Sequence, residues 1–452
     1  MRRALTAALL ATSMFSLPAT AHAQAMTAEE AAAVRAELAA LEAQVQPVEA
    51  RLDAATAEPA PAPLPTPAPP SVTAKPATEI SWKGAPELKT ADGWSFKPRG
   101  RMQFDMAGID APAGVLGTRG GLTSEIRRVF LGVDGKIPGG ISYRLEADFA
   151  GGSAELTDVY LTYGKGPWSV TMGHVRHFTS LEDVTSDLFT SFTERAAFVP
   201  AFGFERRVGL GAQYKGKQLL VQAGVFGDDA NSLLDDKNNS ISADGRVVWM
   251  PKFGKTQLHL GGSVHFRDFN DLSSTARYRA RPFVPTTEVR LVDTGDISAT
   301  GENGYGLEGA MVSGPFHASG EAFWQTMKRP GLADPTFFGG YAEVGMLLTP
   351  GDSRSYKDGS FDRLRPSKPM TEGGIGAIEI NARYDYLDLN DGAIVGGRQR
   401  IALLGVMWAP IDYVRVIANY GRVMIDDAAI ASATGDRDYS ADVFGLRTQL
   451  DF

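Results

Sequence analysis

The sequence predicts an all-β fold, a 16-stranded antiparallel transmembrane β-barrel preceded by a short periplasmic α-helical (coiled-coil) segment. Three observations predict it. From Arg99 to Phe452 the chain is a succession of runs in which apolar and polar residues alternate, the period of a strand with two different faces. The connections between these runs are short at one end and long at the other, as in outer-membrane barrels. The N-terminus has the pattern of a secretory signal.

The alternation separates two kinds of residue. In the run 141–149, aromatic, aliphatic and other apolar residues occupy the odd positions, and charged residues occupy positions 144, 146 and 148. A barrel with lipid outside and water inside has this pattern. A soluble sandwich or propeller is the alternative, but sandwich sheets need apolar inner faces, and no repeating blade motif is present. The predicted strands are 99–107, 126–135, 141–149, 156–163, 168–175, 207–214, 218–226, 243–250, 256–266, 304–312, 316–326, 338–349, 376–388, 398–409, 413–424 and 441–452. The runs 156–163 and 398–409 can each be read in either phase.

The connections fall into two classes. Those at 138–140, 164–167, 215–217, 251–255, 313–315 and 410–411 are tight, whereas those at 108–125, 176–206, 227–242, 267–303 and 425–440 are long. Barrels of the outer membrane have short periplasmic turns and longer extracellular loops. The connection 350–375 is an exception, because it is several times longer than a usual hairpin turn yet falls on the short-turn side.

The connection between the strands 168–175 and 207–214 is about thirty residues long. Loops of this length inside a compact domain are usually functional or disordered. We therefore expect it to fold back into the lumen and to determine what passes.

The residues before the barrel divide into three parts. Residues 1–23 are a predicted signal peptide, with Arg2 and Arg3 ahead of an apolar core and a small-residue cleavage site. Residues 24–57 are a predicted helix with a heptad seam, and 58–96 are a proline-rich linker and lead-in to the barrel at 97–452. The seam consists of Val34, Leu38, Leu41, Val45, Val48 and Leu52. It predicts either a short coiled coil joining like chains or a solvated alanine-rich helix.

Composition excludes several classes of function. The formal net charge is −8, and removal of the signal, which carries two arginines and no acidic residue, makes it −10. No basic face stands out, so nucleic acid is not an expected partner. The chain has no cysteine, which excludes disulfides and thiolate chemistry. No second apolar stretch approaches the roughly 20 residues of a spanning helix.

The last predicted strand ends on an aromatic residue. Phe444, Leu446, Leu450 and Phe452 share one phase. A terminal aromatic residue of this kind resembles the signal by which barrel-insertion machinery recognises outer-membrane barrels, so we expect Phe452 to serve that purpose.

Several motifs, taken in order along the chain, resemble the phosphate-selective porin O and P family. They are the runs 127–135, 143–152 and 155–158, Ser180-Leu181-Glu182 with Thr185-Ser186 and Glu194-Arg195 in the long loop, and the runs 292–295, 305–308 and 314–316. The pieces cover most of Arg99 to Phe452. The resemblance implies a homotrimer of sixteen-stranded barrels in the outer membrane, passing anions through a constriction of inward-folded loops.

The resemblance also implies a constriction lined by arginine, whose planar guanidinium can bind an oxyanion through two hydrogen bonds. The candidate pore-lining, anion-binding residues are Arg99, Arg101, Arg128, Arg144, Arg206, Arg207, Arg383, Arg415 and Arg447. The candidate constriction-loop residues are Ser180, Glu182, Thr185, Ser186, Glu194 and Arg195. The loop has no lysine and is acidic overall, and acidic residues share the lumen phase with the arginines. A structural lattice of ion pairs is therefore the alternative interpretation of these arginines.

Two other groups of residues are less informative. The basic run 277–281 predicts either a solvated loop or an arginine patch that gathers anions over the pore. Among the histidines, His259 and His265 share a strand face but lie about 20 Å apart, too far to share an ion. No metal site, cofactor or catalytic group is predicted, and the chain is not expected to be an enzyme.

The predicted function is passive diffusion of phosphate or other small oxyanions through an anion-preferring outer-membrane porin. The alternatives are a general diffusion porin, or a barrel anchor whose periplasmic helix tethers the outer membrane to the cell wall. The expected partners are like chains in a homotrimer, lipid and lipopolysaccharide, the insertion machinery, small anions and, for the anchor, peptidoglycan bound by residues 24–57.

Overall fold

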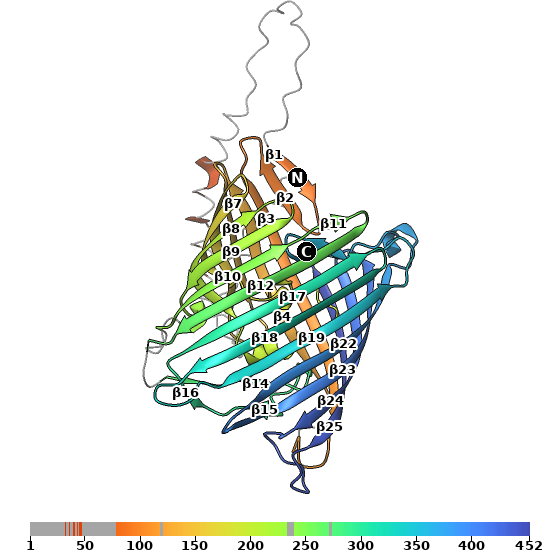
Figure 1. The fold of residues 1–452 in the computed structure, drawn as a ribbon. Coiled ribbons are helices and arrows are strands. Elements are labelled where there is room, and N and C mark those ends of the chain that lie inside the picture. The colour runs from red at the N-terminus through yellow and green to blue at the C-terminus, as the bar shows by residue number, and fades with distance from the viewer. Residues whose placement is uncertain are drawn as a thin grey trace, which may run out of the picture. The chain divides into compact units, whose positions relative to one another are not determined.

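The barrel closes by pairing its first strand with its last. The computed structural model describes residues 78–117, 121–232, 239–270 and 274–452, together with a few isolated positions between 32 and 47. In the described part of 78–452, sixteen antiparallel strands form the barrel wall, and β25 pairs with β3 from Asp442↔Asp110 to Asp451↔Arg101 (Figure 1). The barrel strands are β3 (Ser95–Asp110), β4 (Gly121–Ile137), β5 (Ile141–Asp148), β6 (Glu155–Lys165), β7 (Trp168–Arg176), β8 (Arg206–Lys215), β9 (Leu219–Phe226), β10 (Ile241–Trp249), β12 (Thr256–Asp268), β17 (Gly301–Ser313), β18 (Phe316–Lys328), β19 (Thr336–Leu347), β22 (Ala377–Asp391), β23 (Ile394–Ile411), β24 (Val414–Asp426) and β25 (Tyr439–Asp451).

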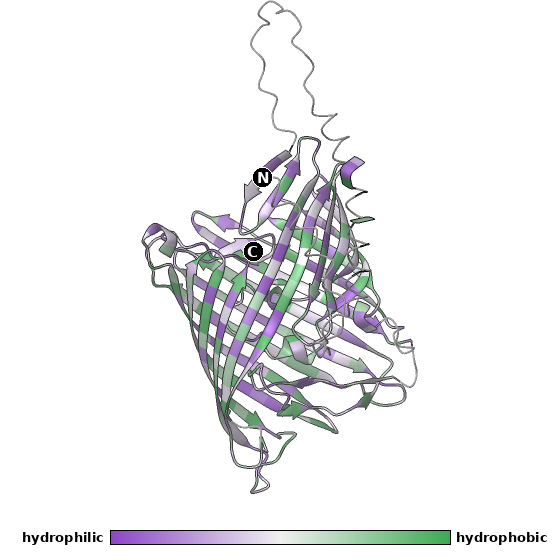
Figure 2. Cartoon of the chain, turned by 180° about the vertical axis from the view of Figure 1, so that it is seen from behind, coloured by the Kyte–Doolittle hydropathy of each residue, from purple (hydrophilic) through white to green (hydrophobic). Residues whose placement is uncertain are grey.

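Each predicted strand coincides with one of these sixteen, so the predicted barrel is confirmed. The wall separates two environments, as the alternation requires: Leu145 is 51% exposed on the outer face, whereas the neighbouring Glu146 is 1% exposed in the lumen. Hydrophobic and hydrophilic residues interchange along the strands (Figure 2). No helix of the described residues is long and apolar enough to cross a membrane.

Three short strands extend the same sheet. A hairpin of β1 (Thr78–Trp82) and β2 (Pro86–Thr90) continues from β3, within the predicted lead-in, and β11 (Lys252–Phe253) pairs with β12. The predicted signal peptide and proline-rich linker lie outside the described residues. So does the predicted seam, apart from Val45.

The two ends of the barrel differ. The C-terminus and the β1–β2 hairpin lie at one end, which we call the short-turn end, and the loop carrying β14, β15 and β16 lies at the opposite, long-loop end (Figure 1). At the long-loop end, residues 269–300 form the ribbons β13 (Thr275–Ala276) with β16 (Ile297–Ser298) and β14 (Arg279–Ala280) with β15 (Val292–Asp293). At the short-turn end, residues 348–376 form β20 (Ser355–Lys357), β21 (Ser360–Asp362) and η2 (Met370–Glu372). The long connection predicted on the short-turn side is therefore an ordered hairpin.

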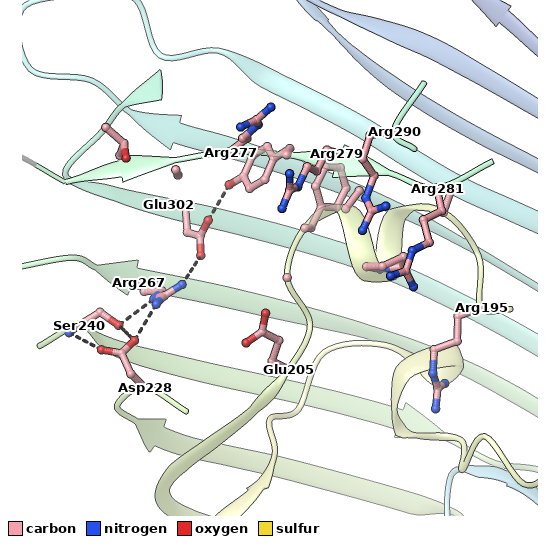
Figure 3. Close-up of a pocket in the computed structure, with 18 of the residues that line it drawn as sticks. Arg195, Glu205, Asp228, Ser240, Arg267, Arg277, Arg279, Arg281, Arg290 and Glu302 are labelled. Atoms are coloured by element: carbon pink, nitrogen blue, oxygen red, sulfur yellow. Dashed lines mark hydrogen bonds and ion pairs between the residues drawn. The ribbon is translucent and has the colours of Figure 1, made fainter. Parts of the chain in front are cut away.

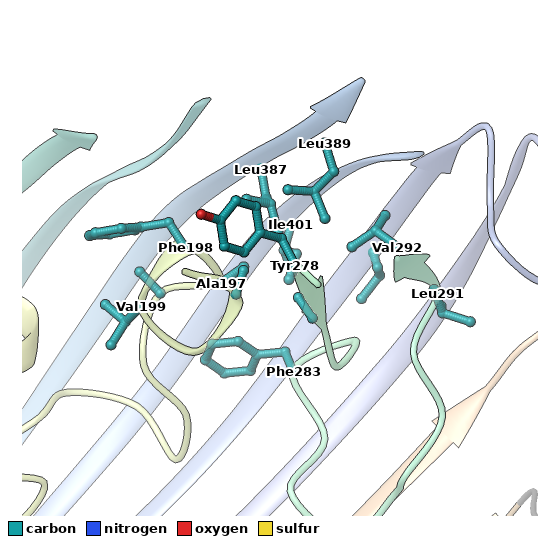
Figure 4. Close-up of a cluster of buried hydrophobic side chains, with 14 of the residues drawn as sticks. Ala197, Phe198, Val199, Tyr278, Phe283, Leu291, Val292, Leu387, Leu389 and Ile401 are labelled. Carbon is teal, nitrogen blue, oxygen red and sulfur yellow. The ribbon is translucent and has the colours of Figure 1, made fainter. Parts of the chain in front are cut away.

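Two loops build an apolar core inside the long-loop half of the barrel. Residues 177–205, which we call the inward loop, contain α3 (Leu181–Val184) and α4 (Phe198–Ala201). Phe198 of α4 and Phe283 of the 269–300 loop lie among lumen-facing residues such as Leu387 and Ile401 (Figure 4). These wall residues are apolar because they contact the loops and not water. This is why β23 is apolar on both faces and its phase could not be chosen from the sequence.

Gly132 sets the spacing between β4 and β5. A Cβ at Gly132 would overlap the carbonyl oxygen of Leu145 and lie 2.9 Å from the Cα of Glu146. Because backbone cannot rotate away as a side chain can, Gly132→Ala should destabilise the barrel by about 1–3 kcal/mol, the usual cost of overpacking. The readout is the temperature at which the folded electrophoretic band converts to the unfolded one. Gly309→Ala is the control, since its Cβ would be 3.8 Å from the nearest atom; equal shifts for both variants would contradict the prediction.

Candidate functional site in the barrel lumen

The inward loop enters the lumen through a short capped helix. Ser180 is the N-cap of α3, and its Oγ accepts a hydrogen bond from the backbone N–H of Asp183 at 3.2 Å. The carboxylate of Glu321 on β18 accepts the N–H groups of Leu181 and Glu182 at 2.9 and 2.6 Å. The free N–H groups of the first helical turn are thus satisfied by the wall, which fixes where the loop turns inward.

Arg383 on β22 makes an almost fully enclosed contact between wall and loop. Its side chain is 1% exposed and donates to Glu182 of the loop at 3.0 Å and to Glu343 of β19 at 2.6 Å. Its guanidinium lies over the rings of Phe192 and Tyr341, with distances of 5.0 and 4.5 Å to their centroids. One cation therefore joins two buried carboxylates, one on the wall and one on the loop.

Backbone carbonyl groups farther along the inward loop also accept hydrogen bonds from the barrel wall. Arg415 on β24 donates to the carbonyl oxygen of Leu188 and, at 2.8 Å, to that of Thr190. Asn419 accepts the hydroxyl of Thr193 at 2.8 Å. The loop thus lies against the β18–β24 wall and occupies that side of the lumen.

Asp187 ties the inward loop to the next part of the wall, β3 and β4, which follows β24 and β25 around the barrel. It accepts from Arg101 of β3 and, at 2.7 Å, from Arg128 of β4. Burial opposes ionisation of this carboxyl, but the guanidinium groups of Arg101 and Arg128 outweigh it and hold the pKa of Asp187 well below its ordinary value. Asp187 is therefore charged at neutral pH and forms ion pairs with both arginines.

A row of alternating charges lines the wall from β3 to β8. Arg99 lies 2.9 Å from Asp134, and Arg144 lies 2.7 Å from Asp134 and 3.2 Å from Asp158. Arg206 completes the row at 2.6 Å from Asp158. We call these five residues the ion-pair row. Their side chains are partly exposed, 27% in the case of Arg144, so the row faces water in the part of the lumen that the inward loop leaves open.

The 348–376 loop enters the lumen from the short-turn end. Arg354 lies 2.9 Å from Glu379 of β22 and donates to the carbonyl of Phe189 in the inward loop. Tyr356 Oη lies 2.6 Å from Nδ1 of His259 on β12. This loop spans from β22 to β12 and contacts the inward loop, so inserted segments narrow the lumen from both ends.

A cavity of about 720 Å³ lies at the long-loop end of the barrel and is lined in part by the inward loop; we call it the vestibule (Figure 3). Arginine dominates its charged lining. The charged residues are Arg127, Arg195, Arg267, Arg277, Arg279, Arg281 and Arg290, with Glu194, Glu205, Asp228 and Glu302. Among the described residues the lining therefore carries more positive than negative side chains, in a protein whose net charge is negative.

Two vestibule arginines have no carboxylate partner among the residues that the structure describes. Arg277 lies 2.6 Å from Asp293, and Arg281 lies 2.6 Å from Glu288. Within the described parts of the chain, neither Arg195 nor Arg279 lies within ion-pair distance of a carboxylate. Arg195 donates one hydrogen bond to the carbonyl of Thr185 at 2.7 Å, and its buried Nη1 has no hydrogen-bond partner among the described residues. These two groups are available to an anion.

A family model described as phosphate-selective porin O and P matches residues 96–452. The chain belongs to this family. It is accordingly an outer-membrane porin, a channel and not an enzyme. The porin is 44% identical over 411 residues to an uncharacterized protein of Caulobacter vibrioides, covering 88% of this chain and 83% of that one. It is 28% identical over 422 residues to Porin O of Pseudomonas aeruginosa, covering 82% of this chain and 92% of that protein.

Solved structures confirm the fold. The outer-membrane protein OmpT of Vibrio cholerae matches with a TM-score of 0.51 at 14% identity, over 83% of this chain and 100% of that one. An anion-selective porin from Comamonas acidovorans matches with a TM-score of 0.51 at 11% identity, over 79% of this chain and 100% of that one.

The predicted pore arginines of the porin divide into two groups. Arg101, Arg207, Arg383, Arg415 and Arg447 are buried against carboxylates or loop carbonyls. Arg99, Arg128, Arg144 and Arg206 are partly exposed, although each also has a carboxylate partner. The lattice alternative therefore describes the first group, and the second group could also meet a solute.

The predicted constriction-loop residues all lie in the inward loop, where most of them support it. Ser180 caps α3 and Glu182 contacts Arg383, while the Thr185 hydroxyl lies 3.4 Å from the backbone N–H of Phe361 and Ser186 Oγ lies 3.3 Å from that of Leu188. Glu194 and Arg195 differ, since both line the vestibule.

Sequence analysis missed two groups. Arg127, Arg176 and Arg267 were not proposed as lumen residues, and Arg176 pairs with Asp183 of the inward loop. The fold also brings His177 beside His265, although these residues are 88 positions apart and the sequence indicates no metal-binding companion for either. The length of the loop predicts that His177 lies near a constriction, but no local sequence pattern indicates which residues it contacts.

Proposed function

We propose that this porin conducts small anions by passive diffusion, with phosphate or another small oxyanion as its natural solute. The observation that carries the proposal is the vestibule, whose described lining residues include seven arginines and four carboxylates. Charges of one sign around a low-dielectric mouth concentrate counter-ions there and raise their rate of entry. Arg195 and Arg279 supply guanidinium groups that are not engaged with carboxylates of the described residues, so an oxyanion can bind them without breaking an ion pair.

Beyond the vestibule, farther into the lumen, partly exposed guanidinium groups continue along the wall. Arg128 is the first of them, and the ion-pair row follows. An anion leaving the vestibule can pass from one guanidinium to the next because each arginine has donors beyond those used by its carboxylate partner. Narrowing by the inward loop and the 348–376 loop would keep the anion close to this wall.

The ion-pair row is also the observation that favours the general diffusion alternative. Its three arginines are matched by Asp134 and Asp158 of the row and by Glu146, which lies 2.8 Å from Arg99, so the wall itself is close to electrically balanced. On that alternative the vestibule would accelerate entry of anions, but the row would not select among solutes.

Assembly and the N-terminal segment extend the proposal. A trimer form of OmpT of Vibrio cholerae has the same fold, with a TM-score of 0.51, and we propose a homotrimer for this porin. We further propose that residues 1–23 direct export, that residues 24–57 lie in the periplasm and join like chains or contact peptidoglycan, and that the insertion machinery recognises Phe452.

The selectivity of the purified porin in planar bilayers tests the proposal. Under a salt gradient the reversal potential should show preference for chloride over potassium, and phosphate should block the chloride current. Arg195→Ala with Arg279→Ala should raise the half-blocking phosphate concentration about tenfold or more, because one charge-assisted hydrogen bond contributes roughly 1.5–3 kcal/mol and 1.4 kcal/mol is tenfold.

Arg422→Ala is the matched control for the double variant. Arg422 is an exposed arginine paired with Asp442, and it lies outside the vestibule lining. It should leave the block unchanged. A wild-type porin with no preference between chloride and potassium would favour the general diffusion alternative.

A further inference from the structure

Two histidines and an aspartate meet where the inward loop leaves the barrel wall. His177 is the first residue of the loop, Asp244 lies on β10, and His265 lies on β12. Nδ1 of His177 lies 3.3 Å from Oδ1 of Asp244, and Nδ1 of His265 lies 2.5 Å from the same oxygen. One ligand atom from each of the three residues lies within 4.8 Å of the others. Their exposed fractions are 1%, 4% and 2%.

The surroundings of His265 orient its ring. Nε2 of His265 lies 3.4 Å from Oε1 of Glu302, and the hydroxyl of Tyr278 donates to Oε2 of Glu302 at 2.5 Å. A carboxylate that accepts the Nε2–H of a histidine leaves the Nδ1 lone pair free, which is the usual arrangement behind a metal-binding imidazole. With Nε2 protonated, that lone pair points at a carboxylate oxygen, and only a cation or a second proton between them makes the contact favourable.

We propose that His177, Asp244 and His265 bind a divalent transition-metal ion such as Zn²⁺. Two imidazole nitrogens and one carboxylate oxygen are donors that Zn²⁺ prefers, and three protein ligands leave one position for water. Ligand atoms of a tetrahedral zinc site are about 3.4 Å apart, given metal–ligand distances of about 2.1 Å. The His177–Asp244 distance of 3.3 Å already fits, and the His265–Asp244 distance must increase by about 1 Å.

Nearby arginines do not oppose the ion, because their charges are compensated. Arg267 lies 2.7 Å from Asp228 and 3.4 Å from Glu302, and Arg207 lies 3.6 Å from Asp228. Glu302 and Asp228 both line the vestibule (Figure 3).

The proposed site would fasten the entrance of the inward loop. His177 belongs to the loop, whereas Asp244 and His265 belong to adjacent wall strands paired at Asp244↔His265. Two residues farther along, the carbonyl of Thr179 accepts a hydrogen bond from Ser263 of β12. A bound ion would add a second connection between the loop and the same strand, and would reduce the loop's excursions into the open lumen.

Metal titration of the folded porin tests the proposal. The purified porin is stripped with a chelator, and Zn²⁺ binding is followed by equilibrium dialysis, with the ligand-field absorption of Co²⁺ reporting nitrogen and oxygen ligands. We expect one ion per chain. His265→Gln and Asp244→Asn should each abolish saturable binding, and Glu302→Gln should weaken it about 10- to 100-fold, the usual effect of losing an outer carboxylate.

His259→Gln is the matched control. His259 lies on the same strand and the same lumen face, but its Nδ1 contacts Tyr356 and its Nε2 lies 3.5 Å from Glu308. It should bind Zn²⁺ like the wild type, and heat-modifiable migration confirms that each variant has a folded barrel. Absence of saturable binding to the folded wild type would overturn the proposal and leave His265 as a protonated link between Asp244 and Glu302. Unchanged binding in His177→Ala would equally overturn it.

Discussion

Replacing Arg383 with alanine is expected to release the inward loop and raise the single-channel conductance of the porin. The variant leaves Glu182 and Glu343 buried without the cation that lies 3.0 and 2.6 Å from them. Removing one partner of a buried ion pair costs about 3–5 kcal/mol, because the remaining charge is uncompensated. The loop can escape this cost by moving Glu182 into water, which widens the open part of the lumen. Conductance in planar bilayers measures the result.

Further substitutions in this variant distinguish the effect of the lost positive charge from the effect of the lost side-chain packing. In the Arg383→Ala background, Glu182→Gln with Glu343→Gln should restore a conductance close to that of the wild type, since neutral amides tolerate burial better than carboxylates. Arg422→Ala is the control, because an exposed ion pair contributes only about 0–1 kcal/mol. A folded Arg383→Ala porin with wild-type conductance would show that Arg415 and Glu321 suffice to hold the loop.

The barrel could be predicted from the sequence because a wall between lipid and water imposes period-2 alternation on each strand. The prediction was least certain where that condition fails. Ile401 and Leu403 on β23 face an apolar core made by the inserted loops, so both faces of the strand are apolar and the phase disappears. Connection lengths predicted that the inward loop enters the lumen, and they marked 350–375 as unusually long without indicating that it enters the lumen too.

The sequence does not predict which side chains contact one another inside the lumen. Arg144 and Arg383 occupy the same phase of their strands, yet Arg383 is enclosed by the inward loop and Arg144 remains partly exposed. The difference depends on where the loop lies, which is determined by contacts such as Glu321 with the N–H groups of α3. The meeting of His177 with His265 has the same origin, since loop closure and strand order together bring them within one cluster.

The balance of charge along the wall decides whether the row of ion pairs contributes to selectivity. Arg99 also lies 2.8 Å from Glu146, so three arginines of the row face Asp134, Asp158 and Glu146 and the group is neutral. A neutral row neither attracts nor repels ions over long distances. Loss of one arginine should therefore leave the row with a net negative charge, which attracts cations and repels anions.

Arg144→Ala is accordingly expected to shift the porin toward cations, by about 5- to 30-fold in the anion-to-cation permeability ratio if the lost interaction is roughly 1–2 kcal/mol. Screening does not remove the effect, because the Debye length of about 8 Å at physiological salt is comparable to the dimensions of a narrow pore. The reversal potential under a salt gradient measures it, and Arg437→Ala in the 427–438 loop, where Arg437 donates to the carbonyl of Ala428, is the control.

Adding Asp134→Asn to Arg144→Ala restores neutrality. If that double variant recovers the wild-type permeability ratio but not phosphate block, Arg144 contacts the passing anion directly. If it recovers both, Arg144 acts only through the charge of the row, and if Arg144→Ala alone changes neither, the row is structural.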